Sequence, residues 1–446
     1  MIRADYPLDK ASRSAGRNAC ASKSRLHFFE CSDKNLVMSF ETARDGWNRR
    51  SFLRAAFMAG VAGVASPVFA GESVVTMPFA NGERRLVKFP QKRELLLVTM
   101  RPPQLETPFS VFNEGVLTPN DAFFVRYHLA QVPTNIDLDQ FRVTVKGKVN
   151  SPLTLSMADL KTQFEPVEIV AVNQCSGNSR GFSNPRVAGG QLGNGAMGCA
   201  RWKGVRLKDV LNKAGVAAGA KQVTFNGLDQ PVLEKTPDFI KALEVDHCLD
   251  GETMLAYQMN GEDLPMLNGY PLRLVVPGYY GTYWVKHLNE ITVTEEEFAG
   301  FWMKSAYLIP DNAGACVAPG ATPSKTRPIG RYNVRSFITS LADGDRVEAG
   351  QRLTIRGIAF DGGYGISSVR FSSDGGQTWR EATLGRDFGK YAFREWTIPF
   401  SAARAGSYEL KVCAVNRIGQ SQPTEALWNP PGYMRNVIET VRVTAA

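Results

Sequence analysis

The sequence of 446 residues contains seven cysteines but no pair at CxxC spacing. This absence excludes zinc fingers, the common iron–sulfur patterns and the CxxCH site of an attached c-type haem, so no haem is expected in this chain. Histidine is scarce, with four in the chain and three after residue 70. Neither a Walker loop nor a dinucleotide-binding glycine fingerprint is present. After residue 70 no apolar run reaches the roughly 20 residues of a bilayer crossing, so no membrane span is expected.

Positive charge is concentrated at the start of the chain. The net charge is +9, but residues 1–70 hold 11 Lys/Arg against 6 Asp/Glu, and the remainder holds 41 against 37. With no basic run left in the main body, a nucleic-acid partner is not expected. The length, the 43% apolar content, and the 41 Gly and 25 Pro predict two or three packed domains rich in strands and turns.

An export signal is predicted within residues 1–70. The basic segment Asn48–Arg54 precedes a short apolar, Ala/Gly-rich stretch, and Val68 and Ala70 stand at the −3 and −1 positions of a cleavage site. The paired arginines resemble a twin-arginine signal, which exports folded proteins. This signal predicts a periplasmic location and a cofactor inserted before export. Met38 would begin a signal of ordinary length and is an alternative start.

The rest of the chain predicts two domains. Residues 71–325 alternate short apolar strands with a few helical stretches, which favours an α+β domain; the segments are Leu95–Thr99, Phe141–Val145, Val167–Val172, Leu272–Val276 and the helix Leu207–Ala214. A segment rich in Pro and Gly, residues 309–330, is a plausible boundary. Residues 326–446 show short alternating runs between turns, typical of an all-β, immunoglobulin-like sandwich. Asp374–Gly376 indicates a hairpin between two of them.

Three segments carry residues suited to chemistry. Cys175 follows an apolar strand in Asn-Gln-Cys-Ser-Gly-Asn-Ser-Arg, where a thiol is placed to be a ligand, a nucleophile or simply a buried cysteine. Arg126 and His128 are two apart on a strand-like run and so share a face, which suits a small oxyanion. Arg273 and Lys286 flank a glycine-rich turn where two cations and backbone N–H groups would cradle a phosphate.

Together these segments resemble the sulfite oxidase family of mononuclear molybdenum enzymes. The similarity extends over about residues 90–446 and is carried by Phe123–His128, Asn173–Arg180, Gly195–Gly198, Arg201–Leu207, Leu255–Gly261, Gly269–Arg273 and Trp284–Lys286. With Tyr307 at the end of Phe-Trp-Met-Lys-Ser-Ala-Tyr, the chain resembles most the molybdopterin subunit of bacterial periplasmic sulfite dehydrogenases. The C-terminal sandwich is similar to this family's dimerisation domain.

The resemblance implies a molybdenum–molybdopterin cofactor with Cys175 as the single protein ligand of the metal, since soft sulfur suits it. It implies an anion pocket of Arg126, His128 and Arg180, with Tyr307 donating a hydrogen bond near the transferred oxygen. The implied pterin-binding residues are Phe124, His128, Asn268, Arg273, Thr282 and Lys286. The implied reaction is oxidation of sulfite to sulfate, with electrons passed singly to a c-type cytochrome subunit. A homodimer and a heterodimer with that cytochrome both remain open.

The sequence departs from the animal relatives at two places. Pro431 stands where they carry an arginine of the anion pocket, and Asn268 stands where they carry a histidine that contacts the pterin. One rival within the family is a sulfane dehydrogenase of a thiosulfate-oxidising complex. A rival of another class is a non-enzymatic periplasmic binding or scaffold protein. The Asp-box-like run Ser372–Trp379 is a single copy, and a cysteine protease lacks a clear His/Asn partnership, so neither hydrolase is favoured.

Overall fold

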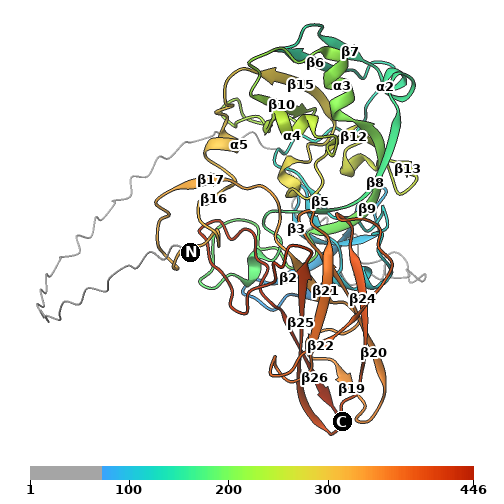
Figure 1. Cartoon of the computed structure of the whole chain (residues 1–446), viewed down its shortest axis with the longest axis vertical. Coiled ribbons are helices and arrows are strands. Elements are labelled where there is room, and N and C mark those ends of the chain that lie inside the picture. Colours follow the sequence, from blue (N-terminus) through green and yellow to red (C-terminus); the bar gives the residue numbers. More distant parts are fainter. Residues whose placement is uncertain (1–72) are drawn as a thin grey trace, which may run out of the picture. The chain divides into compact units, whose positions relative to one another are not determined.

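Strands dominate residues 73–446, the part of the chain that the computed structural model describes (Figure 1). The predicted export signal, with Met38, lies outside the described residues and stays a prediction. Among the described residues, no helix combines the length and apolar character needed to cross a membrane. All five cysteines of this part are free thiols, four of them buried.

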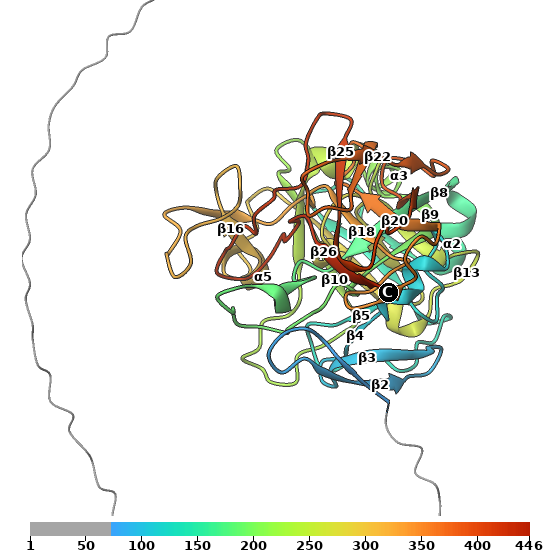
Figure 2. The same ribbon diagram turned by 90° about the horizontal axis from the view of Figure 1, so that it is seen from below.

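The first sheet is antiparallel and runs in chain order, side by side along one edge of Figure 2. Its strands are β1 (Val74–Thr76), β2 (Glu83–Lys88), β3 (Glu94–Thr99), β4 (Gln104–Glu106) and β5 (Val125–Arg126). Because β5 pairs β4 through Gln104↔Arg126, the sheet brings Arg126 to the interior of the molecule.

The second sheet has the order β11-β10-β15-β6-β7, with β15 and β6 parallel. Its strands are β6 (Val143–Gly147), β7 (Leu153–Leu155), β10 (Gln222–Gly227), β11 (Lys241–Glu244) and β15 (Leu288–Thr294). The third sheet has the order β13-β12-β9-β8, and β14 pairs β12. Its strands are β8 (Pro166–Gln174), β9 (Met197–Arg206), β12 (Met254–Met259), β13 (Glu262–Asp263) and β14 (Arg273–Val275).

Strand β8 delivers the candidate thiol. Its first residues alternate between exposed and half-buried positions, and from Val170 to Gln174 every side chain is buried. It pairs antiparallel with β9 along its whole length, from Pro166↔Val205 to Gln174↔Met197. A strand that alternates and then becomes buried on both faces enters the core at its carboxyl end. Cys175 is the next residue, so it leaves the strand inside the protein.

The helices are short. They are α2 (Met157–Gln163), α3 (Leu207–Ala214), α4 (Val245–Leu249) and α5 (Phe301–Lys304), together with the 3-10 turns η1 (Phe109–Asn113), η2 (Arg180–Phe182), η3 (Met266–Asn268) and η4 (Gly281–Tyr283). Helix α3 has the bounds that the sequence predicts, and it ends at Gly215 with a φ of +70°, a conformation that glycine adopts without strain. The expected α+β character therefore takes the form of sheets joined by few helices.

The C-terminal part is a two-sheet β structure, as the alternating runs predict. One sheet is β18 (Arg335–Ile338), β20 (Leu353–Phe360), β24 (Arg394–Phe400) and β23 (Thr383–Leu384). The other is β19 (Arg346–Val347), β26 (Thr440–Ala445), β25 (Gly406–Asn416), β21 (Ile366–Ser372) and β22 (Arg380–Glu381). Side chains from both sheets share one apolar core, including Phe371 and Trp396. The immunoglobulin-like assignment within this class stays a prediction.

The hairpin at Asp374–Gly376 forms as predicted, between β21 and β22. The segment predicted as a linker contains two paired strands, β16 (Leu308–Pro310) and β17 (Thr326–Pro328), and β16 lies near α5 in both views (Figures 1 and 2). Phe337, Phe360 and Phe393 of the C-terminal part belong to the same buried cluster as Val172 of β8. The C-terminal part thus packs directly on the core that carries the site, and the exact domain boundary at 325/326 stays a prediction.

Candidate active site

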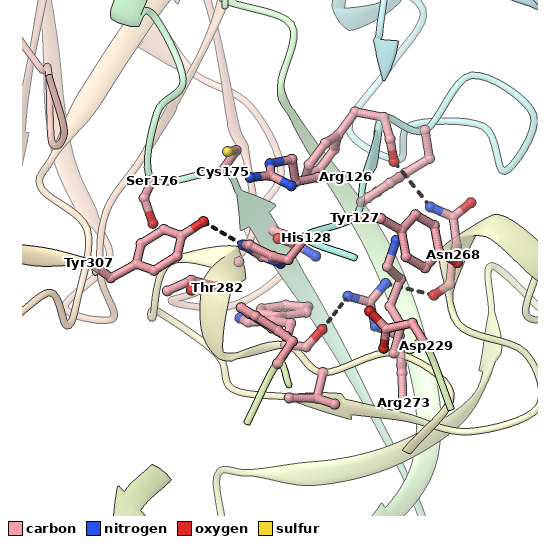
Figure 3. A pocket seen from close by; sticks show the side chains of 18 residues that line it. Arg126, Tyr127, His128, Cys175, Ser176, Asp229, Asn268, Arg273, Thr282 and Tyr307 are labelled. Atoms are coloured by element: carbon pink, nitrogen blue, oxygen red, sulfur yellow. Dashed lines mark hydrogen bonds between the residues drawn. The ribbon is translucent and has the colours of Figure 1, made fainter. Parts of the chain in front are cut away.

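A cavity lies where β5, the end of β8 and η4 meet (Figure 3). Nine of the ten site residues named from the sequence line it; they are Phe124, Arg126, His128, Cys175, Asn268, Arg273, Thr282, Lys286 and Tyr307. The tenth, Arg180, does not line it. Figure 3 shows Cys175, Arg126 and His128 toward one end of the cavity, and Asn268 and Arg273 toward the other.

Cys175 is 8% exposed and belongs to the main buried cluster, yet it reaches the cavity wall. Its backbone N–H donates to the Ala196 carbonyl at 2.9 Å, which holds the turn after β8 against β9. The next residue, Ser176, also lines the cavity, and its Oγ is buried without a hydrogen-bond partner. The Cys175 thiol is therefore placed to bind a ligand in the cavity.

Tyr307 and His128 form a pair across the cavity. The tyrosine hydroxyl and the imidazole Nε2 are hydrogen-bonded (Figure 3), and the imidazole stacks on Phe239 with ring centroids 3.6 Å apart. Burial, followed by the charges of Arg126 and Lys241, lowers the pKa of His128 well below its ordinary value. The imidazole is therefore neutral at ordinary pH, and its Nε2 donates to or accepts from the phenol hydroxyl according to its tautomer.

Cations gather at the opposite end of the cavity. The Arg273 guanidinium is 3% exposed and donates to the Asn268 and Trp284 carbonyls at 2.9 and 3.2 Å. Burial lowers the pKa of Arg273 to about 9. Burial and the Arg273 charge lower the pKa of Lys286, which the Asp229 carboxylate partly opposes. A bound anion would raise the pKa values of both groups again, because it favours their charged forms.

Asn268 is held by protein partners. Its Oδ1 accepts from the Lys92 ammonium at 2.5 Å, and its Nδ2 donates to the Phe124 carbonyl at 3.1 Å. Lys92 is 3% exposed, and burial lowers its pKa to about 7. The Asn268 amide thus ties η3 to the strand that carries Arg126, and a further cation lies directly behind the cavity wall.

Arg180 does not line the cavity, although the resemblance places it in the anion pocket. Its Nε donates to the Pro431 carbonyl at 2.8 Å and its Nη1 to the Gly190 carbonyl at 3.2 Å. The guanidinium lies 5.0 Å from the ring centroid of Tyr433. It also passes close to Gly177, where a Cβ would meet the guanidinium carbon at 2.7 Å, so a side chain there would displace the guanidinium. Arg180 belongs to a shell behind the cavity rather than to its lining.

Sequence reasoning missed several residues that shape the site. Asp229 lines the cavity, and burial raises its pKa to about 6. Lys241 is fully buried, and its ammonium lies 5.2 Å from the Tyr307 ring centroid. Asn173 and Ser176 flank the cysteine inside a segment that the sequence singled out, so their position was available as a signal. No local sequence pattern identifies Asp229 or Lys241 as residues of the site.

The cavity fits an anionic, heteroatom-rich ligand. Five buried polar atoms of its lining have no protein partner among the described residues: Arg126 Nη1, Asn173 Oδ1, Ser176 Oγ, Arg273 Nε and Thr282 Oγ1. At Gly281 a Cβ would lie 2.3 Å from Asn173 Oδ1, so a side chain there would close this part of the wall. Buried polar groups are normally satisfied, so orphaned donors and acceptors around one space point to a ligand. One thiol with several cations suits a pterin phosphate and a thiophilic metal.

Two family descriptions match the chain. Residues 128–302 match the oxidoreductase molybdopterin binding domain, and residues 326–446 match the Mo-co oxidoreductase dimerisation domain. The mitochondrial sulfite oxidase of Homo sapiens is 35% identical over 363 residues, which cover 77% of this chain and 65% of that protein, so this chain spans less than two thirds of its length. The sulfite oxidase of Arabidopsis thaliana is 32% identical over 384 residues, covering 80% of this chain and 96% of that protein.

A solved structure shows the same fold. The sulfane dehydrogenase SoxCD from Paracoccus pantotrophus superposes with a TM-score of 0.67 at 23% identity, covering 86% of this chain and 93% of that chain. At this identity the likeness supports the architecture alone. Since both family descriptions match, and the Arabidopsis protein aligns over nearly its whole length, the chain belongs to the sulfite oxidase family of molybdenum oxidoreductases.

Proposed function

We propose that this protein oxidises sulfite to sulfate at a molybdenum–molybdopterin centre and passes the electrons to a c-type cytochrome. The observation that carries the proposal is the cavity itself, in which the Cys175 thiol, the unpartnered Arg126 guanidinium and the Tyr307–His128 pair lie together. The identity to sulfite oxidases supports sulfite as the substrate. The absence of CxxCH in the sequence supports an external electron acceptor.

The bound cofactor would supply oxygen transfer and two-electron redox chemistry. Cys175 would hold the metal through its thiolate, since the thiol reaches the wall and no disulfide occupies it. Arg273 and Lys286 would hold the pterin phosphate, and the depressed pKa values of both groups would recover on binding it. Thr282, Asn268 and Phe124 would line the pterin, and all three side chains are buried.

Arg126 would bind the substrate anion through its free Nη1 at the thiol end of the cavity. Tyr307 would donate a hydrogen bond to the oxygen being transferred, and neutral His128 would hold the phenol oxygen in place through the hydrogen bond at its Nε2. The imidazole is positioned by its stack on Phe239, and the Tyr307 ring by its stack on Tyr433, with ring centroids 5.4 Å apart. Rigid placement of donors is what makes such hydrogen bonds effective in the transition state.

The electrons that the reaction releases support a c-type cytochrome as the partner. Sulfite oxidation releases two electrons, whereas c-type cytochromes accept them singly. We propose a cytochrome that docks at the end of the cavity where Arg126 and His128 lie, in the periplasm to which the predicted export signal leads. Steering of an acidic cytochrome by this basic region would make the reduction rate fall as ionic strength rises. The match of residues 326–446 to a dimerisation domain supports a homodimer in addition to the complex with the cytochrome.

The test is sulfite-dependent reduction of a c-type cytochrome by protein whose molybdenum content has been measured. Turnover with sulfite that requires molybdenum and slows with added salt supports the proposal. Turnover with thiosulfate or sulfane sulfur but not with sulfite would replace it by the sulfane dehydrogenase. Full-rate reduction of oxygen without cytochrome would leave an oxidase. Purified protein without molybdenum and without activity would favour the binding or scaffold function.

A further inference from the structure

Lys241 is the first residue of β11, and its side chain ends behind the wall of the cavity. The residue is fully buried and does not line the cavity itself. Its ammonium lies 5.2 Å from the ring centroid of Tyr307 and 4.6 Å from that of Tyr283. A cation is attracted to the face of an aromatic ring. Lys241 therefore places a positive charge against the ring whose hydroxyl is bonded to His128.

This buried charge lacks a counter-ion. The ammonium has three donors, and the hydrogen bond it makes within the described residues goes to the Trp302 carbonyl at 2.6 Å. Burial lowers the pKa of Lys241 to about 7, and no carboxylate among the described residues opposes this effect. Two other buried lysines near the cavity, Lys92 and Lys286, each have a carboxylate that does oppose it. An uncompensated buried charge is costly, so the fold alone does not account for it.

Tyr307 connects this charge to the cavity. Its ring contacts the ammonium, while its hydroxyl faces His128 in the lining. In the interior of a protein a charge acts strongly over a few Å, because little water screens it. A positive charge beside a phenol makes the hydroxyl proton more acidic and the hydroxyl a stronger donor. Phe239, two residues before Lys241, stacks on His128, so one short segment contacts both members of the pair.

We propose that Lys241 is a positioning residue of the active site, whose buried ammonium strengthens the hydrogen bond that Tyr307 donates to an oxyanion in the cavity. The ammonium acts through the phenol and does not touch the anion. An anion bound in the cavity also favours the charged form of Lys241. A fixed charge of this kind needs no rearrangement during a reaction. The identity of the oxyanion as sulfite rests on the proposed function, whereas the effect on the donor rests on the geometry.

The test is a double-mutant cycle of Lys241→Met and Tyr307→Phe in the molybdenum-loaded protein at pH 6. Methionine keeps the apolar stem of the side chain and removes the charge. The two quantities are kcat with sulfite and the Kd of sulfate, measured by calorimetry. We expect Lys241→Met to lower kcat and to weaken sulfate binding by about 3–10-fold each, less than the loss of a direct donor. In the Tyr307→Phe background the same change should have an effect below about twofold, because the hydroxyl that transmits the charge is absent.

The melting temperature separates this role from a structural one. Replacing an unpaired buried charge by an apolar side chain is neutral or stabilising, so Lys241→Met should melt at or above the wild-type temperature although it turns over more slowly. Lys241→Gln keeps an amide donor for the Trp302 carbonyl without the charge, and it should behave like Lys241→Met. The matched control is Lys161→Met, since the exposed Lys161 lies 5.4 Å from the Tyr257 ring centroid. This control should change none of the three quantities.

Three results overturn the proposal: additive effects in the cycle, a wild-type kcat in Lys241→Gln, and a melting temperature that falls together with kcat. Failure of both Lys241 variants to fold assigns a structural role and overturns it as well. The two proposals fail separately. Wild-type protein that does not oxidise sulfite, with a non-additive cycle in sulfate binding, removes the proposed function and leaves the role of Lys241. Sulfite oxidation with additive effects removes the role of Lys241 and leaves the function.

Discussion

Replacing Arg126 with glutamine separates anion binding from the chemical step. Arg126 lies on β5, its guanidinium lines the cavity near Cys175, and its Nη1 is buried without a protein partner. Glutamine keeps an amide donor but loses the charge. Because the native side chain has an unused donor at Nη1, the main loss falls on whatever anion binds there rather than on the fold.

The expected magnitude follows from one charge-assisted hydrogen bond. Such a bond is worth about 1.5–3 kcal/mol, which corresponds to a rise of roughly 10–150-fold in the KM for sulfite with little change in kcat. A second effect appears in the pH profile. Arg126 is the largest charged contributor that lowers the pKa of His128, after burial. Removing it raises the pKa of His128, so any loss of activity on acidification moves to higher pH.

Steady-state kinetics on molybdenum-quantified protein, from pH 5 to 9, measure both effects. Arg180→Gln is the informative comparison, because it also breaks bonds to the Pro431 and Gly190 carbonyls and should lower the melting temperature, whereas Arg126→Gln should not. The exposed Arg352 supplies the control Arg352→Gln, which should change neither quantity. A fall in kcat with an unchanged KM in Arg126→Gln would refute this reasoning and assign Arg126 to the chemical step.

Three further predictions concern the thiol, the phenol and a buried carboxylate. Cys175→Ser should yield folded protein whose molybdenum content, measured by elemental analysis, falls to background. The control is Cys316→Ser at a half-exposed cysteine, and this variant should retain its molybdenum. Tyr307→Phe should lower kcat by about 10–100-fold and KM little, because it removes one transition-state donor and leaves His128 Nε2 unpartnered; an unchanged kcat would move the donor elsewhere. Burial raises the pKa of Glu106 from 4.5 to about 7, so the folded chain holds a proton that the unfolded chain releases. Stability should therefore fall by about 3 kcal/mol as the pH rises from 4.5 to 7, and Glu106→Gln should abolish that dependence in denaturant titrations.

Local sequence determined much of this protein. The alternating runs of the C-terminal part and the turn at Asp374–Gly376 produce the two-sheet structure with its hairpin, because side-chain period and turn chemistry act over a few residues. Helix α3 follows from its apolar spacing and the glycine behind it. Cys175 emerges into the core because the side chains of β8 become continuously buried just before it. Through the family resemblance, the segments around Arg126, Cys175 and Arg273 also identified eight cavity residues, and the segment that ends at Tyr307 identified a ninth.

Tertiary packing alone decided the rest of the site. Arg180 stands within the singled-out segment, yet carbonyls of Gly190 and Pro431 hold it behind the cavity. Lys241 comes from a different sheet, and Tyr433 comes from the C-terminal part to stack on Tyr307. No local pattern encodes contacts such as Arg180 with Pro431 or Tyr307 with Tyr433, because residues so far apart in the sequence meet only after the sheets have packed. The sequence by itself determined which chemical groups were available, and the packing decided which of them face the cavity.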